Sequence, residues 1–168
     1  LARCFRTPYI LAFQGAGPWQ TSIGKRLARK RYKYAAFISV RDQESVDRLS
    51  QWGITSILTS DPAVALFVKH TKPDTVAGRL VIIPRHNSGS AFTSEVEQAL
   101  RKQLWTSVRI LLLQPDEREK AVAASLKKII PVAETVEIRT VHQLLDEVGS
   151  CELVVTQRYH GALAAMAL

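Results

Sequence analysis

Short runs of β-branched and other apolar residues alternate with longer segments in which apolar residues recur every three or four positions. This alternation predicts strands joined by helices, and therefore an α/β fold with parallel strands. The predicted strands are residues 9–13, 37–40, 56–59, 80–83, 108–113, 136–138 and 152–156. The predicted helices are residues 22–36, 43–52, 93–105, 117–129 and 141–148, and a last helix that follows residue 156. Ser22 and Asp42 are the predicted N-caps of the first two helices.

A polar segment that contains a proline interrupts the alternation near residue 70. We predict a linker over residues 69–75, between the end of one nucleotide-binding-type domain (residues 1–68) and most of a second (residues 76–168). The chain begins with Leu1 rather than Met and ends at Leu168 inside an apolar helical pattern without a stop signal. We therefore expect a fragment that is truncated at both ends.

The composition excludes several classes of protein. With 168 residues, 46% of them hydrophobic, and only two cysteines, the chain is neither disordered nor a disulfide scaffold. Its apolar runs are far shorter than the about 20 residues that span a bilayer. The first residues lack the apolar stretch of a signal peptide, so we expect a cytoplasmic location.

The formal net charge is +8, and six of the nine residues from 25 to 33 are basic. A solvated helix face, an anionic ligand, an anionic membrane surface and nucleic acid are the alternatives. Nucleic acid is the least favoured, because the run lacks interleaved aromatic residues and no recognition motif accompanies it. We therefore expect no nucleic-acid partner. The basic residues are Lys25, Arg26, Arg29, Lys30, Arg31 and Lys33.

In open parallel sheets, ligands bind beyond the carboxyl ends of the strands, so the residues that follow each strand are the candidates for chemistry. The first strand is followed by Gln14-Gly-Ala-Gly-Pro18, in which Gly15 and Gly17 let the backbone approach a ligand, although such a sequence is also a common turn. Arg41 lies at the next strand-to-helix junction and suits an anion site. The alternative is a surface arginine paired with Asp42 or Glu44.

In the second half, Arg85 follows the strand over residues 80–83 and faces either a cleft or solvent. Arg158 and His160 lie two residues apart between a buried strand and an alanine-rich helix, and Gly161 follows them. This arrangement favours a site that binds an anion and moves a proton over a histidine satisfied within the core. The four histidines lack the spacing of paired metal ligands, so we expect no metal.

In their order along the chain, these elements resemble the polysaccharide pyruvyl transferases, and within them the CsaB-like enzymes of cell-wall polysaccharide and exopolysaccharide synthesis. The resemblance is carried by Gln14-Gly-Ala-Gly-Pro18, Ser39-Val-Arg-Asp-Gln-Glu-Ser45, Thr59-Ser-Asp-Pro62 and Thr156-Gln-Arg-Tyr-His-Gly-Ala162. It implies two Rossmann-like domains as in GT-B enzymes, with the active site between them. It also implies transfer of a pyruvyl group from phosphoenolpyruvate to a sugar as a cyclic ketal.

The resemblance also implies roles for individual residues. Arg41 matches an Arg-Asp motif, Arg158 and His160 match an Arg-x-His motif, and Arg85 matches an arginine that follows a strand. Tyr159 departs from the family, which usually has a small aliphatic residue there. The acceptor implied is a saccharide or a lipid-linked saccharide, and the basic stretch would then favour peripheral contact with the anionic inner membrane face.

The chemistry of the donor fits these residue types. Phosphoenolpyruvate carries a carboxylate and a phosphate, which guanidinium groups bind well, and it needs no cofactor. Ketal formation needs a proton at the methylene carbon, and histidine, with an unperturbed pKa of about 6.5, is a suitable carrier. We therefore predict that His160, as acid and base, and Arg158 are catalytic. The predicted substrate-binding residues are Arg41, Arg85, Gln14, Gly15 and Gly17.

Two alternatives remain open at this point. One is a GT-B glycosyltransferase that uses a sugar nucleotide, although no acidic residue stands where the ribose hydroxyls would need one. The other is a truncated module without catalytic activity. The enzyme hypothesis predicts that Arg41, Arg158 and His160 come together in space, although more than a hundred residues separate the first from the others.

Overall fold

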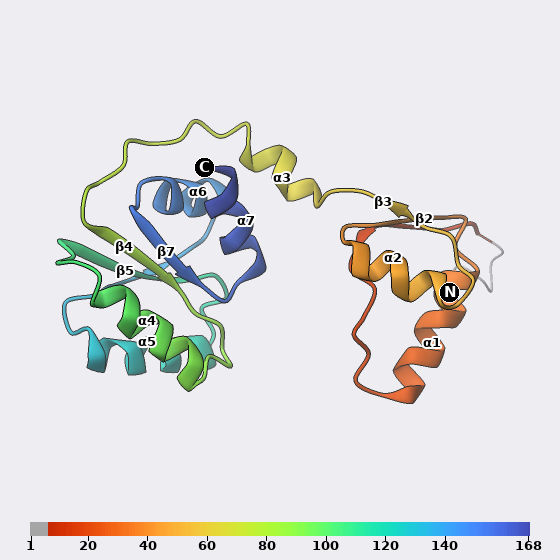
Figure 1. Ribbon diagram of the computed structural model, residues 1–168, viewed down its shortest axis with the longest axis horizontal. Helices are drawn as coiled ribbons and strands as arrows, with labels where there is room; N and C mark the ends of the chain where they lie inside the picture. The colour runs from red at the N-terminus through yellow and green to blue at the C-terminus, as the bar shows by residue number, and fades with distance from the viewer. Residues whose placement is uncertain (1–6) are drawn as a thin grey trace. The chain divides into compact units, whose positions relative to one another are not determined.

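The computed structural model describes residues 7–168, and the chain divides between Pro62 and Ala63 into two compact units (Figure 1). Each unit has its own parallel sheet, so the predicted α/β class is confirmed. Among the described residues, no helix is both long and apolar enough to cross a membrane.

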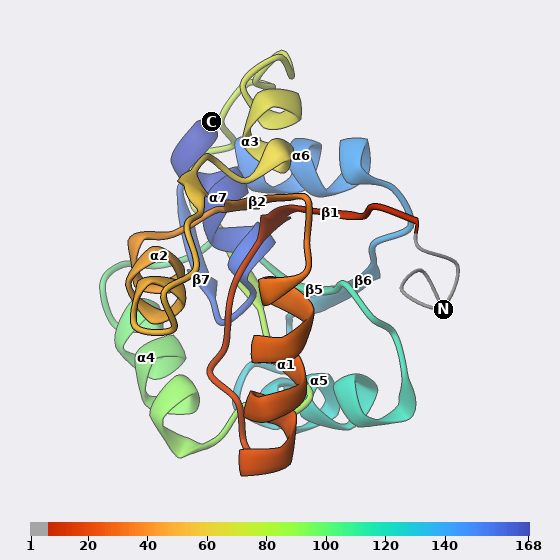
Figure 2. The ribbon, with the colours of Figure 1, turned by 90° about the vertical axis from the view of Figure 1, so that its right-hand side faces the viewer.

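The first unit contains a three-stranded parallel sheet in the order β1-β2-β3. Both of its helices pack on one face of this sheet, as Figures 1 and 2 show together. The core between them includes Ile38, Val40 and Leu49. The elements are β1 (Ile10–Gln14), α1 (Ser22–Lys33), β2 (Phe37–Val40), α2 (Gln43–Ser50) and β3 (Ile57–Leu58).

The second unit contains a four-stranded parallel sheet in the order β6-β5-β4-β7. Helices α4 and α5 cover one face, and α6 and α7 cover the other (Figure 1). The elements are α3 (Pro62–Phe67), β4 (Arg79–Ile83), α4 (Ser90–Leu100), β5 (Ser107–Leu112), α5 (Glu117–Ile129), β6 (Glu134–Glu137), α6 (Val141–Gly149), β7 (Leu153–Thr156) and α7 (Tyr159–Ala167).

Strand β4 explains the two-sided core, because its side chains alternate between the faces. Leu80 and Ile82 pack with the residues of α4 and α5, whereas Val81 and Ile83 pack with those of α6 and α7. All four are completely buried. A central strand that is apolar on both faces is typical of a sheet covered on both sides by helices.

The structure corrects several predicted boundaries. The N-cap of α1 is Thr21 rather than Ser22, because the Thr21 side chain accepts a hydrogen bond from the backbone of Gly24. Helix α4 begins at Ser90 and ends at Leu100, and the indole of Trp105, predicted to lie in this helix, instead donates to the carbonyl of Ala99. The predicted cap Asp42 is confirmed.

Helix α3 was not predicted from the sequence. It is short and begins with a proline, and its residue Phe67 is buried in the core of the second unit with Val81 and Leu145. The division of the chain thus falls after the first residue of this helix, and the rest of the helix belongs to the second unit. The linker over residues 69–75 stays a prediction.

Candidate active site

The loop Gln14–Pro18 in the first unit is fixed against the start of α2. The backbone N–H of Ala16 donates to Ser45 Oγ at 2.7 Å, and the Ala16 carbonyl accepts from Arg48 Nη1 at 3.0 Å. Gly17 has φ +86°, a conformation that other residues rarely adopt. The predicted glycine-containing loop is therefore tied at Ala16 to two residues of α2.

Arg41 lies directly beside this loop. A Cβ placed on Gly15 would lie 3.7 Å from Arg41 Nε, and Gln14 contributes the carbonyl that accepts from the backbone N–H of Arg41 at 3.3 Å. Arg41 Nη1 pairs with Asp61 Oδ2 at 2.8 Å. Asp61 follows β3 in the chain and belongs to the motif Thr59-Ser-Asp-Pro62, although it was not predicted from the sequence as a partner of Arg41.

In the second unit, the strand order brings the carboxyl ends of β5, β4 and β7 together at one edge. A pocket of about 410 Å³ opens there, between the segments that follow these three strands. Three of the predicted site residues, Arg85, Arg158 and His160, line this pocket together. The other lining residues are Leu113, Gln114, Gln157 and Tyr159.

Arg158 forms the inner wall of the pocket. Its Nε donates to the carbonyl of Pro84 at 3.3 Å, its Nη1 donates to Gln114 Oε1 at 3.1 Å, and its Nη2 donates to Glu119 Oε1. The Arg158 side chain is 15% exposed and that of Glu119 is completely buried. Arg158 is therefore held by the segments after β4 and β5 at once.

His160 lies in the first turn of α7 and is exposed. Its ring contacts the ring of Tyr159 in an edge-to-face arrangement, with centroids 5.4 Å apart, and makes no hydrogen bond to the rest of residues 7–168. No side chain caps the N-terminus of helix α7 by a hydrogen bond, and the partial positive charge of this helix end favours an anion. The helix end suits the binding of an anion, and the histidine suits the transfer of a proton to it.

Arg85 is exposed and forms no ion pair within the described part of the chain. Its backbone N–H donates to Ser88 Oγ at 2.9 Å, and Ser88 Oγ donates to Gln157 Oε1 at 2.5 Å. These two bonds tie the loop after β4 to the loop after β7. Gln157 therefore lines the pocket and is held there by Ser88, although neither was among the predicted site residues.

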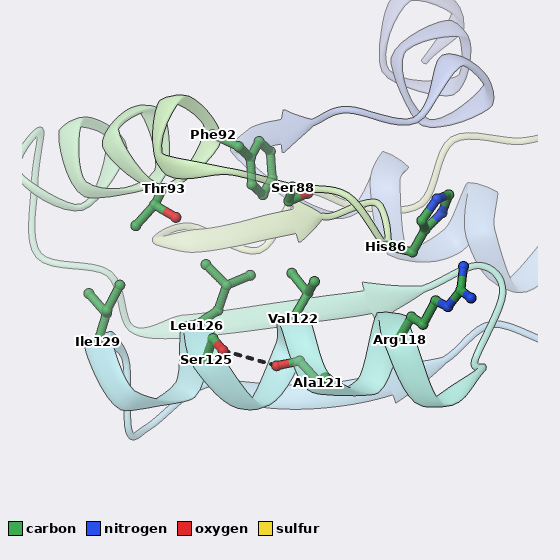
Figure 3. A pocket seen from close by; sticks show the side chains of 10 residues that line it. All are labelled: His86, Ser88, Phe92, Thr93, Arg118, Ala121, Val122, Ser125, Leu126 and Ile129. Atoms are coloured by element: carbon green, nitrogen blue, oxygen red, sulfur yellow. Dashed lines mark hydrogen bonds between the residues drawn. The ribbon is translucent and has the colours of Figure 1, made fainter.

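A second pocket of about 370 Å³ lies between α4 and α5 (Figure 3). Phe92, Val122 and Leu126 supply apolar walls, and His86 and Arg118 lie at one end (Figure 3). None of the predicted site residues lines it. The pocket at the strand ends is thus the one that brings the predicted residues Arg85, Arg158 and His160 together.

We also considered a cysteine nucleophile and a metal site. Burial raises the pKa of the Cys151 thiol to about 11, so it stays protonated and is a poor nucleophile at neutral pH. Over residues 7–168, no three His, Cys, Asp or Glu side chains are grouped so as to hold a metal ion.

The fold and the pocket define an α/β protein with a pocket lined by two arginines and a histidine at the carboxyl edge of a parallel sheet. The sequence model of the polysaccharide pyruvyl transferase family matches residues 5–168, which is almost the whole chain. The chain therefore belongs to the polysaccharide pyruvyl transferase family, and it is a transferase with a saccharide acceptor. No curated protein matches the chain.

Proposed function

We propose that this transferase moves a pyruvyl group from phosphoenolpyruvate to two hydroxyl groups of a saccharide, where it forms a cyclic ketal. The observation that carries the proposal is the convergence of Arg85, Arg158 and His160 on one pocket. Two guanidinium groups suit the two anionic groups of the donor, and an unpaired imidazole suits the proton transfer. No further cofactor is needed for this chemistry.

The donor binds with its charged groups at the arginines. Arg85, which is exposed and has no carboxylate partner among the described residues, is suited to follow the phosphate as it leaves. Arg158 and the first N–H groups of α7 lie on a wall of fixed geometry and suit the carboxylate. Because arginine stays protonated throughout, these contacts stabilise charge without exchanging protons.

His160 delivers a proton to the methylene carbon of phosphoenolpyruvate, which makes the neighbouring carbon electrophilic. One acceptor hydroxyl adds to that carbon, and the second displaces the phosphate. Two carbon–oxygen bonds form, one breaks, and the methylene becomes a methyl group. Of the two hydroxyl protons released, one replaces the proton given by His160 and the other leaves with inorganic phosphate.

We extend the proposal to the first unit and to the acceptor. The two units are halves of a GT-B-type pair, and the rigid loop with Gln14, Gly15 and Gly17, together with Arg41, binds substrate from the first half. The order and spacing of the CsaB-like motifs support this. The acceptor is a saccharide of a cell-wall polysaccharide or exopolysaccharide, free or linked to a lipid.

We also propose peripheral contact between α1 and an anionic membrane surface on the cytoplasmic side. Ile23 and Leu27, one turn apart, are 71% and 58% exposed. Leu27 lies within positions 25 to 33, six of which are basic, and Ile23 lies two residues before them. Exposed apolar residues flanked by cations are typical of helices that lie in the membrane interface.

The reaction is tested with phosphoenolpyruvate that carries carbon-13 at the methylene carbon. The acceptor probe is an exopolysaccharide whose pyruvyl groups have been removed with mild acid. We expect the label to move into a methyl group on the polymer, with one inorganic phosphate released for each methyl formed. Phosphate release without a new methyl signal on the polymer would contradict pyruvyl transfer.

A further inference from the structure

Glu119 is completely buried, although it lies in the first turn of α5 next to solvent-exposed neighbours. A buried carboxylate is costly unless all of its lone pairs find donors. Its Oε2 accepts from the backbone N–H of Gln114 at 2.7 Å, and its Oε1 accepts from Arg158 Nη2. This carboxylate thus joins the segment after β5 to Arg158, the N-cap residue of α7.

Three partners hold the guanidinium of Arg158 from three sides, namely the carbonyl of Pro84, the side-chain amide of Gln114 and Glu119. Because the guanidinium is planar, contacts to all three of its nitrogens fix its plane. An arginine has five N–H donors, and these contacts use three of them. Two donors remain on a side chain that lines the pocket.

We propose that Glu119 is a positioning residue that holds Arg158 with its two remaining N–H donors directed at the anionic ligand of this pocket. This rests on the proposed function only in naming phosphoenolpyruvate as that ligand. Glu119 neutralises the charge of Arg158, so Arg158 contributes mainly direction. Arg85, which has no carboxylate partner within residues 7–168, contributes the net positive charge. Arg158 thus orients the anionic ligand, and Arg85 attracts it.

The test is a double-mutant cycle on ligand binding. Glu119→Gln keeps the shape and the acceptor oxygen but removes the charge, and Arg158→Lys removes the planar fork. We expect Glu119→Gln to raise the dissociation constant for phosphoenolpyruvate by about tenfold, the value of one charge-assisted contact. We also expect Arg158→Lys to weaken binding less in the Glu119→Gln background than in the parent chain.

Calorimetry well below the unfolding temperature of each variant separates positioning from stability. Glu117→Gln, which removes an exposed carboxylate from the same turn, is the matched control and should bind like the parent. Should Glu119→Gln not fold, Gln114→Ala removes another partner of Arg158 at an exposed position and should weaken binding about threefold. Parent-like binding in either variant, or strictly additive losses in the cycle, would overturn the proposal.

Inorganic phosphate is the second probe and separates this inference from the proposed reaction. A parent chain that binds phosphate but prefers it to phosphoenolpyruvate contradicts the proposed donor. In that case the same double-mutant cycle, measured with inorganic phosphate as the ligand, still supports or overturns the role of Glu119. A parent chain that binds neither anion overturns both.

Discussion

His160 and Arg158 are two residues apart in the chain, yet they have opposite surroundings. His160 is exposed and bound to no other described side chain by a hydrogen bond, whereas Arg158 is enclosed by three partners. The division suits their chemistry, because a proton carrier has to reach the substrate and an anion-binding fork works best when its direction is fixed.

Removing the imidazole should affect turnover more than binding. We expect His160→Gln to lower the rate of phosphate release by about 10²- to 10⁴-fold, the usual contribution of a general acid. The dissociation constant for phosphoenolpyruvate should change much less, because the arginines hold the anion. Steady-state phosphate release and calorimetry measure the two quantities.

The matched control is His86→Gln, since His86 is an exposed histidine that lines the pocket between α4 and α5. It should leave turnover close to that of the parent. Near-normal turnover of His160→Gln would remove His160 from the mechanism. A loss of binding with turnover intact at saturation would instead make it an anion ligand.

At the scale of elements, the sequence predicted strands and helices well, because their apolar periodicity reflects burial directly. It did not predict the partners of the site arginines. Asp61 reaches Arg41 from the segment after β3, and Glu119 reaches Arg158 from the first turn of α5. The paired residues are 20 and 39 positions apart in the sequence, so local patterns do not reveal the pairing. Glu119 in particular stands three residues after the helix cap Asp116, where an acidic residue is ordinary in any helix.

Helix α7 can approach the sheet closely only because Gly161 has no side chain. A Cβ there would lie 2.7 Å from Thr156 Oγ1 and 2.8 Å from Ile83 Cδ1. We expect Gly161→Ala to push the first turn of α7 away, at a cost of about 1–3 kcal/mol in the free energy of unfolding. The displaced His160 should also lower turnover.

Denaturant unfolding of Gly161→Ala and Gly89→Ala measures this effect. At Gly89, which precedes α4, an added Cβ meets nothing within 4 Å, so this control should lose only about 0.5 kcal/mol. Equal losses for the two variants would mean that Gly161 is not required for the packing of α7.

At the scale of the whole molecule, vesicle binding tests the proposal that the basic surface of α1 contacts an anionic membrane. We expect the chain to sediment with anionic vesicles and less so at high salt, because charge attraction is screened within about 8 Å at physiological ionic strength. The double variant Ile23→Ser, Leu27→Ser should weaken sedimentation at every salt concentration, because it removes apolar contact.

Neutral vesicles are the control. When these are sedimented, most of the parent chain should remain in the supernatant. Equal sedimentation with neutral and anionic vesicles would contradict the membrane proposal. Helix α1 would then be an ordinary solvated helix.

The central claim is that the pocket at the ends of β4, β5 and β7 takes phosphoenolpyruvate. The most direct measurement is thermal unfolding of the chain titrated with phosphoenolpyruvate and, in parallel, with UDP-glucose. A ligand at a hundred times its dissociation constant stabilises the native state by about 2.7 kcal/mol. We predict that phosphoenolpyruvate raises the unfolding midpoint, that Arg85→Gln reduces this shift, and that UDP-glucose causes none. A shift with UDP-glucose and none with phosphoenolpyruvate would contradict the account.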